Sequence, residues 1–153
     1  MSGVGFETMD GAWAGPSRLI LEGTVYDSES TARVRHVGQG RFVAASYTWS
    51  IEGEPQAGEI VFPAALGDAP ANAAWLDSWH MGDVIMFCQA TFNRDGFASL
   101  LGSYAAPTGP DWGWRTELGL NADDLLVLRM FNITPEGQEE LAVHAEYRRA
   151  GGG

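Results

Sequence analysis

The stretch that decides the fold is Arg41–Ile51, RFVAASYTWSI. From Val43 onward, one set of its alternate positions is entirely apolar, and the other set is small or polar. The apolar set consists of Val43, Ala45, Tyr47, Trp49 and Ile51. Successive side chains of a strand point to opposite faces of a sheet, whereas a helix repeats its apolar positions every three or four residues. The stretch is therefore predicted to be a strand with one buried face.

Segments of the same kind follow one another along the chain, separated by turns. The stretch Thr31–Val37 is joined to Arg41–Ile51 through Gly38-Gln39-Gly40, which is typical of a hairpin. An antiparallel sheet of about ten strands usually closes or splits into two, and closure leaves no exposed edge. We therefore predict an all-β fold, a single closed antiparallel up-and-down barrel. The other strands are expected at 13–21, 57–62, 71–80, 84–92, 97–104, 114–120 and 125–133, with a last strand after the turn at 134–137.

The segment 71–80 is ambiguous. Its alanines, together with Trp75, Leu76 and Trp79, would also suit a short helix. We prefer a strand, because strands and turns surround the segment on both sides.

Length and charge limit the classes of protein and partner. The chain has 153 residues, a formal net charge of −11 and an isoelectric point near 4.5. The length suits one domain, expected at residues 1–150 with a flexible glycine tail at 151–153. The nine basic residues are scattered along the chain. Nucleic acid and membranes are therefore not expected as partners, because both bind through basic patches.

The cellular compartment is inferred from what the sequence lacks. Cys88 is the only cysteine, so neither an intramolecular disulfide nor a thiolate metal cluster can form. Residues 1–16 do not have the basic and apolar segments of a secretory leader, and no apolar run reaches membrane-spanning length. We expect a cytoplasmic protein.

Several short motifs carry a resemblance to a known family. The first, Gly11-Ala12-Trp13-Ala14-Gly15, resembles the G-x-W-x-G signature that opens lipocalin-like and nitrobindin-like barrels. In order, the others are Gly40-Arg41-Phe42-Val43 leading into Tyr47, Trp75-Leu76-Asp77-Ser78, Pro107-Thr108-Gly109, Asp123-Asp124 and Glu146-Tyr147-Arg148-Arg149. Together they look like a bacterial domain-of-unknown-function family within the calycin superfamily of ligand-binding barrels. The segment 63–72 departs from the family in lacking a clear Gly-Tyr-Asp. The resemblance implies a closed lipocalin-like barrel with an interior cavity, and it carries over no catalytic residue.

Aromatic side chains are abundant, with six Trp, seven Phe and four Tyr. Small barrels either fill their interior with side chains or leave room for one small ligand, and ligand pockets have apolar walls with few polar groups. The rings are expected to line such a cavity, with packing of the core and closure of the barrel ends as the alternative. The residues concerned are Tyr47, Trp49, Trp75, Trp79 and Phe87.

Two arginines lie within predicted strands. If Arg129 faces inward, its guanidinium needs a partner, either Asp77 or the carboxylate of an anionic ligand. Fatty-acid-binding barrels, which this architecture resembles, use interior arginines in that way. Arg115, which lies between Trp114 and Thr116, is a second candidate for contact with a ligand. The alternative places Arg129 in solvent, on a strand whose inward residues are Leu126, Leu128 and Met130.

The three histidines lack the local spacing of a metal site. The resemblance to nitrobindin-like barrels implies haem ligation by a histidine near the C-terminus, here His144. However, alternation directs His144 outward, opposite to Leu141, Val143, Ala145 and Tyr147. His36 is expected to be buried and hydrogen-bonded, and His80 to lie at the rim near Asp77 or Asp83.

We expect a barrel that binds a small hydrophobic or anionic amphipathic molecule without catalysis. No catalytic residue, metal or cofactor is expected, although an enzyme is not excluded. The alternatives are a haem-binding or other histidine-dependent barrel, and an interaction module with a filled core. In the second alternative, exposed apolar residues such as Phe42 would form a homodimer interface.

Overall fold

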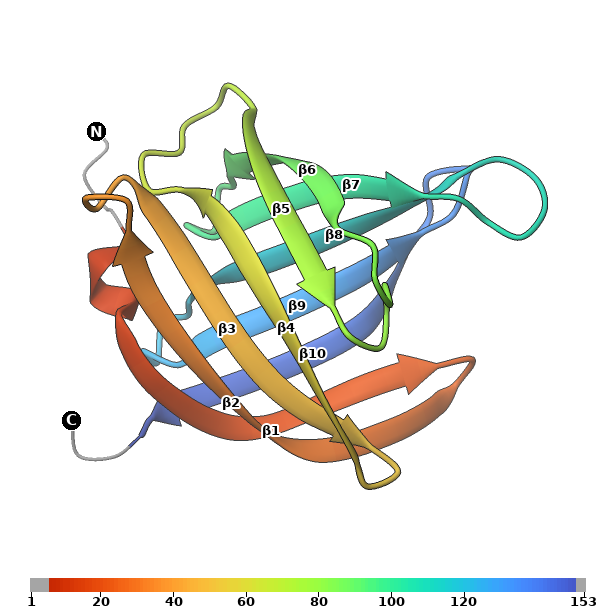
Figure 1. The fold of residues 1–153 in the computed structure, drawn as a ribbon, viewed down its shortest axis with the longest axis horizontal. Coiled ribbons are helices and arrows are strands. Elements are labelled where there is room, and N and C mark those ends of the chain that lie inside the picture. The colour runs from red at the N-terminus through yellow and green to blue at the C-terminus, as the bar shows by residue number, and fades with distance from the viewer. Residues whose placement is uncertain (1–5, 151–153) are drawn as a thin grey trace.

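The computed structural model describes residues 6–150, which form one closed barrel of ten antiparallel strands (Figure 1). Neighbouring strands follow the order of the chain, and β1 closes the barrel by pairing with β10. The predicted all-β closed barrel is therefore confirmed. The expected glycine tail at 151–153 lies outside the described residues.

Most strands agree with the segments expected from the sequence, but the second begins at Thr24 rather than at Thr31. A short 3-10 helix, η1 (Glu7–Met9), precedes the first strand. The strands are β1 (Gly11–Leu21), β2 (Thr24–Val37), β3 (Phe42–Ile51), β4 (Glu54–Pro63), β5 (Ala71–Asp77), β6 (Met86–Phe92), β7 (Ala98–Tyr104), β8 (Trp112–Leu120), β9 (Leu126–Ile133) and β10 (Glu139–Arg149).

Alternation places the core inside the barrel. In β3, Val43, Ala45, Tyr47 and Trp49 are all buried in the main cluster, as the sequence predicts. The ambiguous segment is a strand, but β5 ends at Asp77 rather than at residue 80. It ends there because the Asp77 carboxylate accepts hydrogen bonds from the backbone N–H groups of Trp79 and His80. These bonds begin a turn.

No helix within residues 6–150 has the length and apolar character needed to cross a membrane. The cytoplasmic location stays a prediction.

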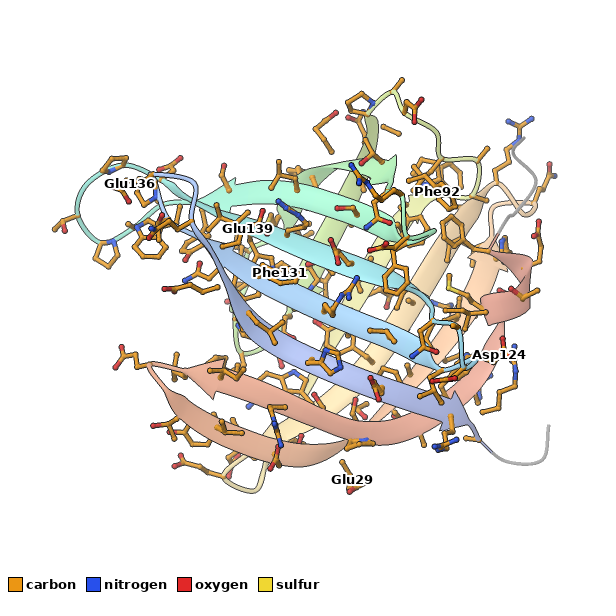
Figure 2. All side chains as sticks on the ribbon, turned by 180° about the vertical axis from the view of Figure 1, so that it is seen from behind. Glu29, Phe92, Asp124, Phe131, Glu136 and Glu139 are labelled. Atoms are coloured by element: carbon orange, nitrogen blue, oxygen red, sulfur yellow. The ribbon has the colours of Figure 1, made fainter. Side chains whose placement is uncertain are left out.

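One end of the barrel is closed by Trp13 of the G-x-W-x-G motif. The ring is 1% exposed, and its Nε1 donates to the Met9 carbonyl of η1 at 2.8 Å. The Arg149 guanidinium lies 4.3 Å above the ring centre. Phe6 adds edge-on contacts with Phe62 and Phe92, and Figure 2 shows Phe92 at this end. The motif therefore acts as a plug.

The second glycine of the motif allows β10 to approach β1. A Cβ atom at Gly15 would lie 2.0 Å from the Glu146 carbonyl oxygen and 3.0 Å from Tyr147 Cα. Since both obstacles are backbone, Gly15→Ala should destabilise the barrel by about 2–3 kcal/mol, as overpacking does. Chemical denaturation would measure this loss. Gly67→Ala is the control, because a Cβ atom there meets nothing within 4 Å. Equal stabilities of the two variants would contradict the close approach.

Candidate functional site

The end of the barrel opposite η1 contains a cavity of about 420 Å³. It is surrounded by the turn after β1, the segment after β5, the ends of β7 and β9, and the starts of β8 and β10. Aromatic rings supply much of the wall, and two glutamates are among the lining residues. The lining residues include Glu22, Trp75, His80, Trp112, Trp114 and Glu140.

Beneath this cavity, the side chain of Asp77 is the centre of a buried polar network. Asp77 is 1% exposed. Its Oδ2 accepts from Tyr47 Oη at 2.7 Å and from Trp49 Nε1 at 3.1 Å. Its Oδ1 accepts from the backbone N–H groups of Trp79 and His80, at 2.8 and 3.0 Å. Trp75 Nε1 donates to the Tyr47 hydroxyl at 2.8 Å. Every polar group named here therefore has a partner, as buried groups require.

The strand register explains why this network forms. Tyr47 in β3 pairs with Gly58 in β4, and Gly58 pairs with Asp77 in β5. A Cβ atom at Gly58 would lie 2.2 Å from the Tyr47 hydroxyl oxygen. The glycine therefore leaves the space across which the Tyr47 side chain reaches Asp77. Burial, followed by the negative charge of Asp77, raises the pKa of Tyr47 well above its usual value, so its hydroxyl stays a donor.

The turn after Asp77 brings His80 into a cluster of indole rings. The His80 ring stacks on Trp49 at 5.5 Å between ring centres and meets Trp79 edge-on at 4.9 Å. It also lies 5.1 Å from Trp114, which stacks on Trp75 at 5.2 Å with 8° between the planes. Burial lowers the pKa of His80, and the Asp77 charge opposes this effect. The imidazole is therefore neutral at pH 7 and above.

Two nitrogen atoms at this site have no hydrogen-bond partner within residues 6–150. They are His80 Nε2 and Trp114 Nε1, both buried, and both side chains line the cavity. By contrast, two other polar residues of the cavity wall form a hydrogen bond with each other: Tyr104 Oη donates to Asn132 Oδ1 at 2.5 Å. Leaving such a buried group unpaired costs about 1–3 kcal/mol.

Five of the residues selected from the sequence come together inside the barrel. Trp75 and Trp79 line the large cavity. Tyr47, Trp49 and Asp77 line a second cavity of about 10 Å³, and His80 lies between the two because it lines both. Their part in ligand binding stays a prediction.

Phe87 does not line the interior, and that expectation is corrected. The ring is 80% exposed, because β6 directs Met86, Cys88 and Ala90 inward and leaves Phe87 on the outer face. Cys88 is buried, as expected for a packing residue, and burial raises the pKa of its thiol to about 11. The thiol is thus protonated near neutral pH.

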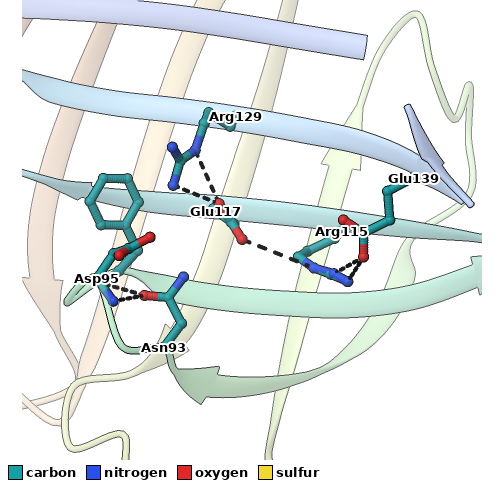
Figure 3. A network of polar contacts seen from close by, with 7 residues as sticks. Asn93, Asp95, Arg115, Glu117, Arg129 and Glu139 are labelled. Atoms are coloured by element: carbon teal, nitrogen blue, oxygen red, sulfur yellow. Dashed lines mark hydrogen bonds and ion pairs between the residues drawn. The ribbon is translucent and has the colours of Figure 1, made fainter. Parts of the chain in front are cut away.

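Arg115 and Arg129 also point away from the interior (Figure 3). Arg129 contacts Glu117 at 2.8 Å and lies 4.7 Å above the Phe97 ring. Arg115 pairs with Glu139. The inward residues of β9 are Leu126, Leu128 and Met130, so parity sends Arg129 to the outer face. Of the two orientations considered for Arg129, the structure therefore shows the outward one, and Arg129 does not pair with Asp77 in the interior.

The remaining histidines lie away from the cavity. His36 is 14% exposed, and its Nδ1 lies 2.7 Å from Asp10, in keeping with the expected hydrogen-bonded histidine. His144 lies on the outer face of β10, 3.3 Å from Glu146. A bulge between Leu141 and Val143 leaves Leu141 37% exposed, so the inward apolar face of β10 begins at Val143 and not at Leu141. No group of three or more potential metal ligands occurs in the part of the chain that the structure describes.

Trp114 and His80 are among the residues of the site that sequence reasoning missed. Trp114 was considered only as a neighbour of Arg115, although its parity with the buried Thr116 and Leu118 could have placed it inside. His80 was expected at the rim, and the Asp77-Ser78-Trp79-His80 turn was the available signal. An aspartate that accepts from the N–H groups two and three residues later folds the chain back over itself.

Comparisons with known proteins agree with this architecture. The S-type phycobiliprotein lyase CPES from Guillardia theta superimposes with a TM-score of 0.63 at 16% identity, covering 97% of this chain and 92% of its own. Rv2717c from M. tuberculosis gives 0.59 at 13% identity, covering 94% of each chain. The comparison with curated proteins gave no significant match. A family model described as a protein of unknown function (DUF1579) matches residues 5–149, which confirms the resemblance seen in the motifs. The chain therefore belongs to the DUF1579 family of proteins of unknown function.

Proposed function

We propose that this barrel binds a small, predominantly apolar ring compound in the 420 Å³ cavity, without catalysing a reaction. The observation that carries the proposal is the aromatic wall of that cavity, which includes Trp75, Trp79, Trp112 and Trp114. The cavity volume falls in the range typical of ligand sites.

The character of the wall supports the same proposal. Trp75 and Trp114 stack nearly parallel, and Trp79 and Trp112 extend the aromatic surface toward the mouth. Flat rings gain both apolar burial and ring–ring contacts against such a surface. The phycobiliprotein lyase from Guillardia theta has a similar fold, which is compatible with a ligand-holding barrel. The interaction-module alternative rests on Phe42, which is 44% exposed, and it stays untested.

N-Phenyl-1-naphthylamine, an uncharged probe that fluoresces in apolar sites, tests the proposal. We expect the protein to enhance its fluorescence saturably. Ala142→Trp should weaken binding at least about tenfold, since residue 142 lines the cavity and a new indole would occupy it. Equilibrium titration of the probe measures both affinities.

The matched control is Ala57→Trp, which adds the same ring at an exposed position that does not line the cavity. This variant should bind the probe as the parent protein does. Absence of saturable enhancement, or equal affinities for the Ala142→Trp variant and the parent, would overturn the proposal.

A further inference from the structure

We infer that the outer face of strands β5, β6 and β7 is the interface of a symmetric homodimer, in which Phe87 of each copy inserts into a hollow on the other. The inference is independent of the ligand site, which lies inside the barrel. The β5–β7 face is defined by the outward residues of three neighbouring strands. They are Asn72, Ala74, Leu76, Phe87, Gln89, Thr91, Ser99, Leu101 and Ser103.

Exposed apolar side chains gather on this face. Phe87, at 80%, is the most exposed large apolar residue within residues 6–150. Ala74 is its partner in β5, and Gln89 is the partner of Leu101 in β7. Leu76 and Leu101 therefore each lie one diagonal step from Phe87, a separation that large side chains bridge. A contiguous apolar patch on a barrel exterior is typical of an interaction site.

The connection that leads into β6 extends the apolar surface. Val84 and Ile85 are 58% and 50% exposed, and they immediately precede Met86, the first residue of β6. Of the large apolar side chains that are exposed within residues 6–150, more than half lie on the β5–β7 face or in this connection. The patch therefore reaches beyond the three strands toward the open end of the barrel.

The absence of charge on this face favours a second copy of the chain as the occupant. None of its nine residues is charged, although charged residues make up 19% of the sequence. The outward side of β2, by contrast, carries Asp27, Glu29, Arg33 and Arg35. Two copies with a net charge of −11 repel each other, and like charges brought together in an interface are costly. A charge-free face lets such a chain meet itself closely, and it offers nothing to a partner of opposite charge.

The rim of the face has the polar character that interfaces show. Glu59 in β4 borders the face on one side, and Arg115 in β8 borders it on the other. Both charges are already neutralised within the chain, because Arg35 lies 3.1 Å from Glu59 and Glu139 pairs with Arg115. An apolar centre within a polar rim is the usual arrangement of a protein interface.

The shape of the face is self-complementary. An open hollow of about 720 Å³ lies on it, with Phe87 at its edge and Asn72, Gln89, Leu101 and Ser103 among the other lining residues. A two-fold interface brings the same patch of both copies together, so a projection and a hollow must lie on one surface. The β5–β7 face meets this condition, since rotation about a two-fold axis places each Phe87 ring in the hollow of the other copy.

Sedimentation velocity of the full chain, from about 5 to about 500 µM, tests the inference. We expect a monomer–dimer equilibrium without larger species, because a two-fold interface closes at two copies. Phe87→Glu should weaken dimerisation at least about tenfold, because it buries carboxylates in an apolar contact. Leu101→Glu should act in the same way. The matched control is Phe42→Glu, the same change at a ring that is 44% exposed on another part of the barrel, and this variant should dimerise as the parent does.

The salt dependence of the parent protein adds a test that needs no variant. Raising the salt concentration from about 0.05 to about 0.5 M should strengthen the dimer severalfold, because salt screens the repulsion between the copies and the face has no ion pair to lose. An interface built on ion pairs would weaken instead, which would overturn the inference.

The remaining outcomes also separate this inference from the proposed function. A monomer at every concentration would overturn the homodimer and leave the face to a different protein. Undiminished dimerisation of both the Phe87→Glu and Leu101→Glu variants, or its loss in Phe42→Glu alone, would place the interface elsewhere and overturn the inference as well. Phe87 and Leu101 do not line the 420 Å³ cavity, so both variants should keep the circular dichroism and the probe affinity of the parent. This result would show that they are folded.

Discussion

Asp77→Ala is expected to lower the free energy of unfolding by about 3–5 kcal/mol, because it removes one acceptor from four buried donors. The Tyr47 hydroxyl and Trp49 Nε1 would lose their shared acceptor. The turn after β5 would lose the two hydrogen bonds that fold His80 over the cavity. Urea denaturation followed by far-ultraviolet circular dichroism measures the change.

Two further variants serve as comparisons for the stability loss of Asp77→Ala. Asp77→Asn keeps one acceptor oxygen but turns an NH₂ group toward some of the donors, so its loss should be substantial and smaller than that of Asp77→Ala. Asp27→Ala removes a carboxylate from an exposed ion pair, with Asp27 67% exposed and 3.1 Å from Arg18. That change should stay within about 0.5 kcal/mol of the parent. Similar losses for the Asp27 and Asp77 variants would show that the network does not stabilise the barrel.

Trp13→Ala should destabilise the protein by about 3–5 kcal/mol, the usual cost of truncating a buried tryptophan. The ring is 1% exposed, and its loss would also leave the Met9 carbonyl without its donor and the Arg149 guanidinium without its aromatic neighbour. Thermal and urea unfolding, both followed by circular dichroism, would measure the loss.

Trp112→Ala is the matched control, since Trp112 lies half-buried at the mouth of the cavity rather than in the closed end. Its stability loss should be clearly smaller than that of Trp13→Ala, while its affinity for the naphthylamine probe should fall. If both tryptophan variants lost the same stability, the distinction between a closed and an open end would be contradicted.

The candidate site was only partly accessible from the sequence. Alternation identified Tyr47 and Trp49 as neighbours on one face, and the structure places both beside Asp77. Phe87 was misplaced and the orientation of Arg129 stayed open, because in each strand either parity offered plausible apolar residues to the core. A shift of one residue moves every side chain of a strand to the opposite face of the sheet. An error about which face one residue occupies therefore misplaces all the side chains of that strand.

For the fold, the sequence by itself was sufficient. Period-two alternation and the turns between segments specify ten strands, and a sheet of that size removes its edges by closing. The alternation and the turns are local properties that can be recognised within a few residues of sequence. Only the tertiary structure decided the site, because its contacts join β3, β5 and β8 with the turn after Asp77. Such distances depend on the register between strands and on the absence of a side chain at Gly58, and no periodicity within one strand encodes either.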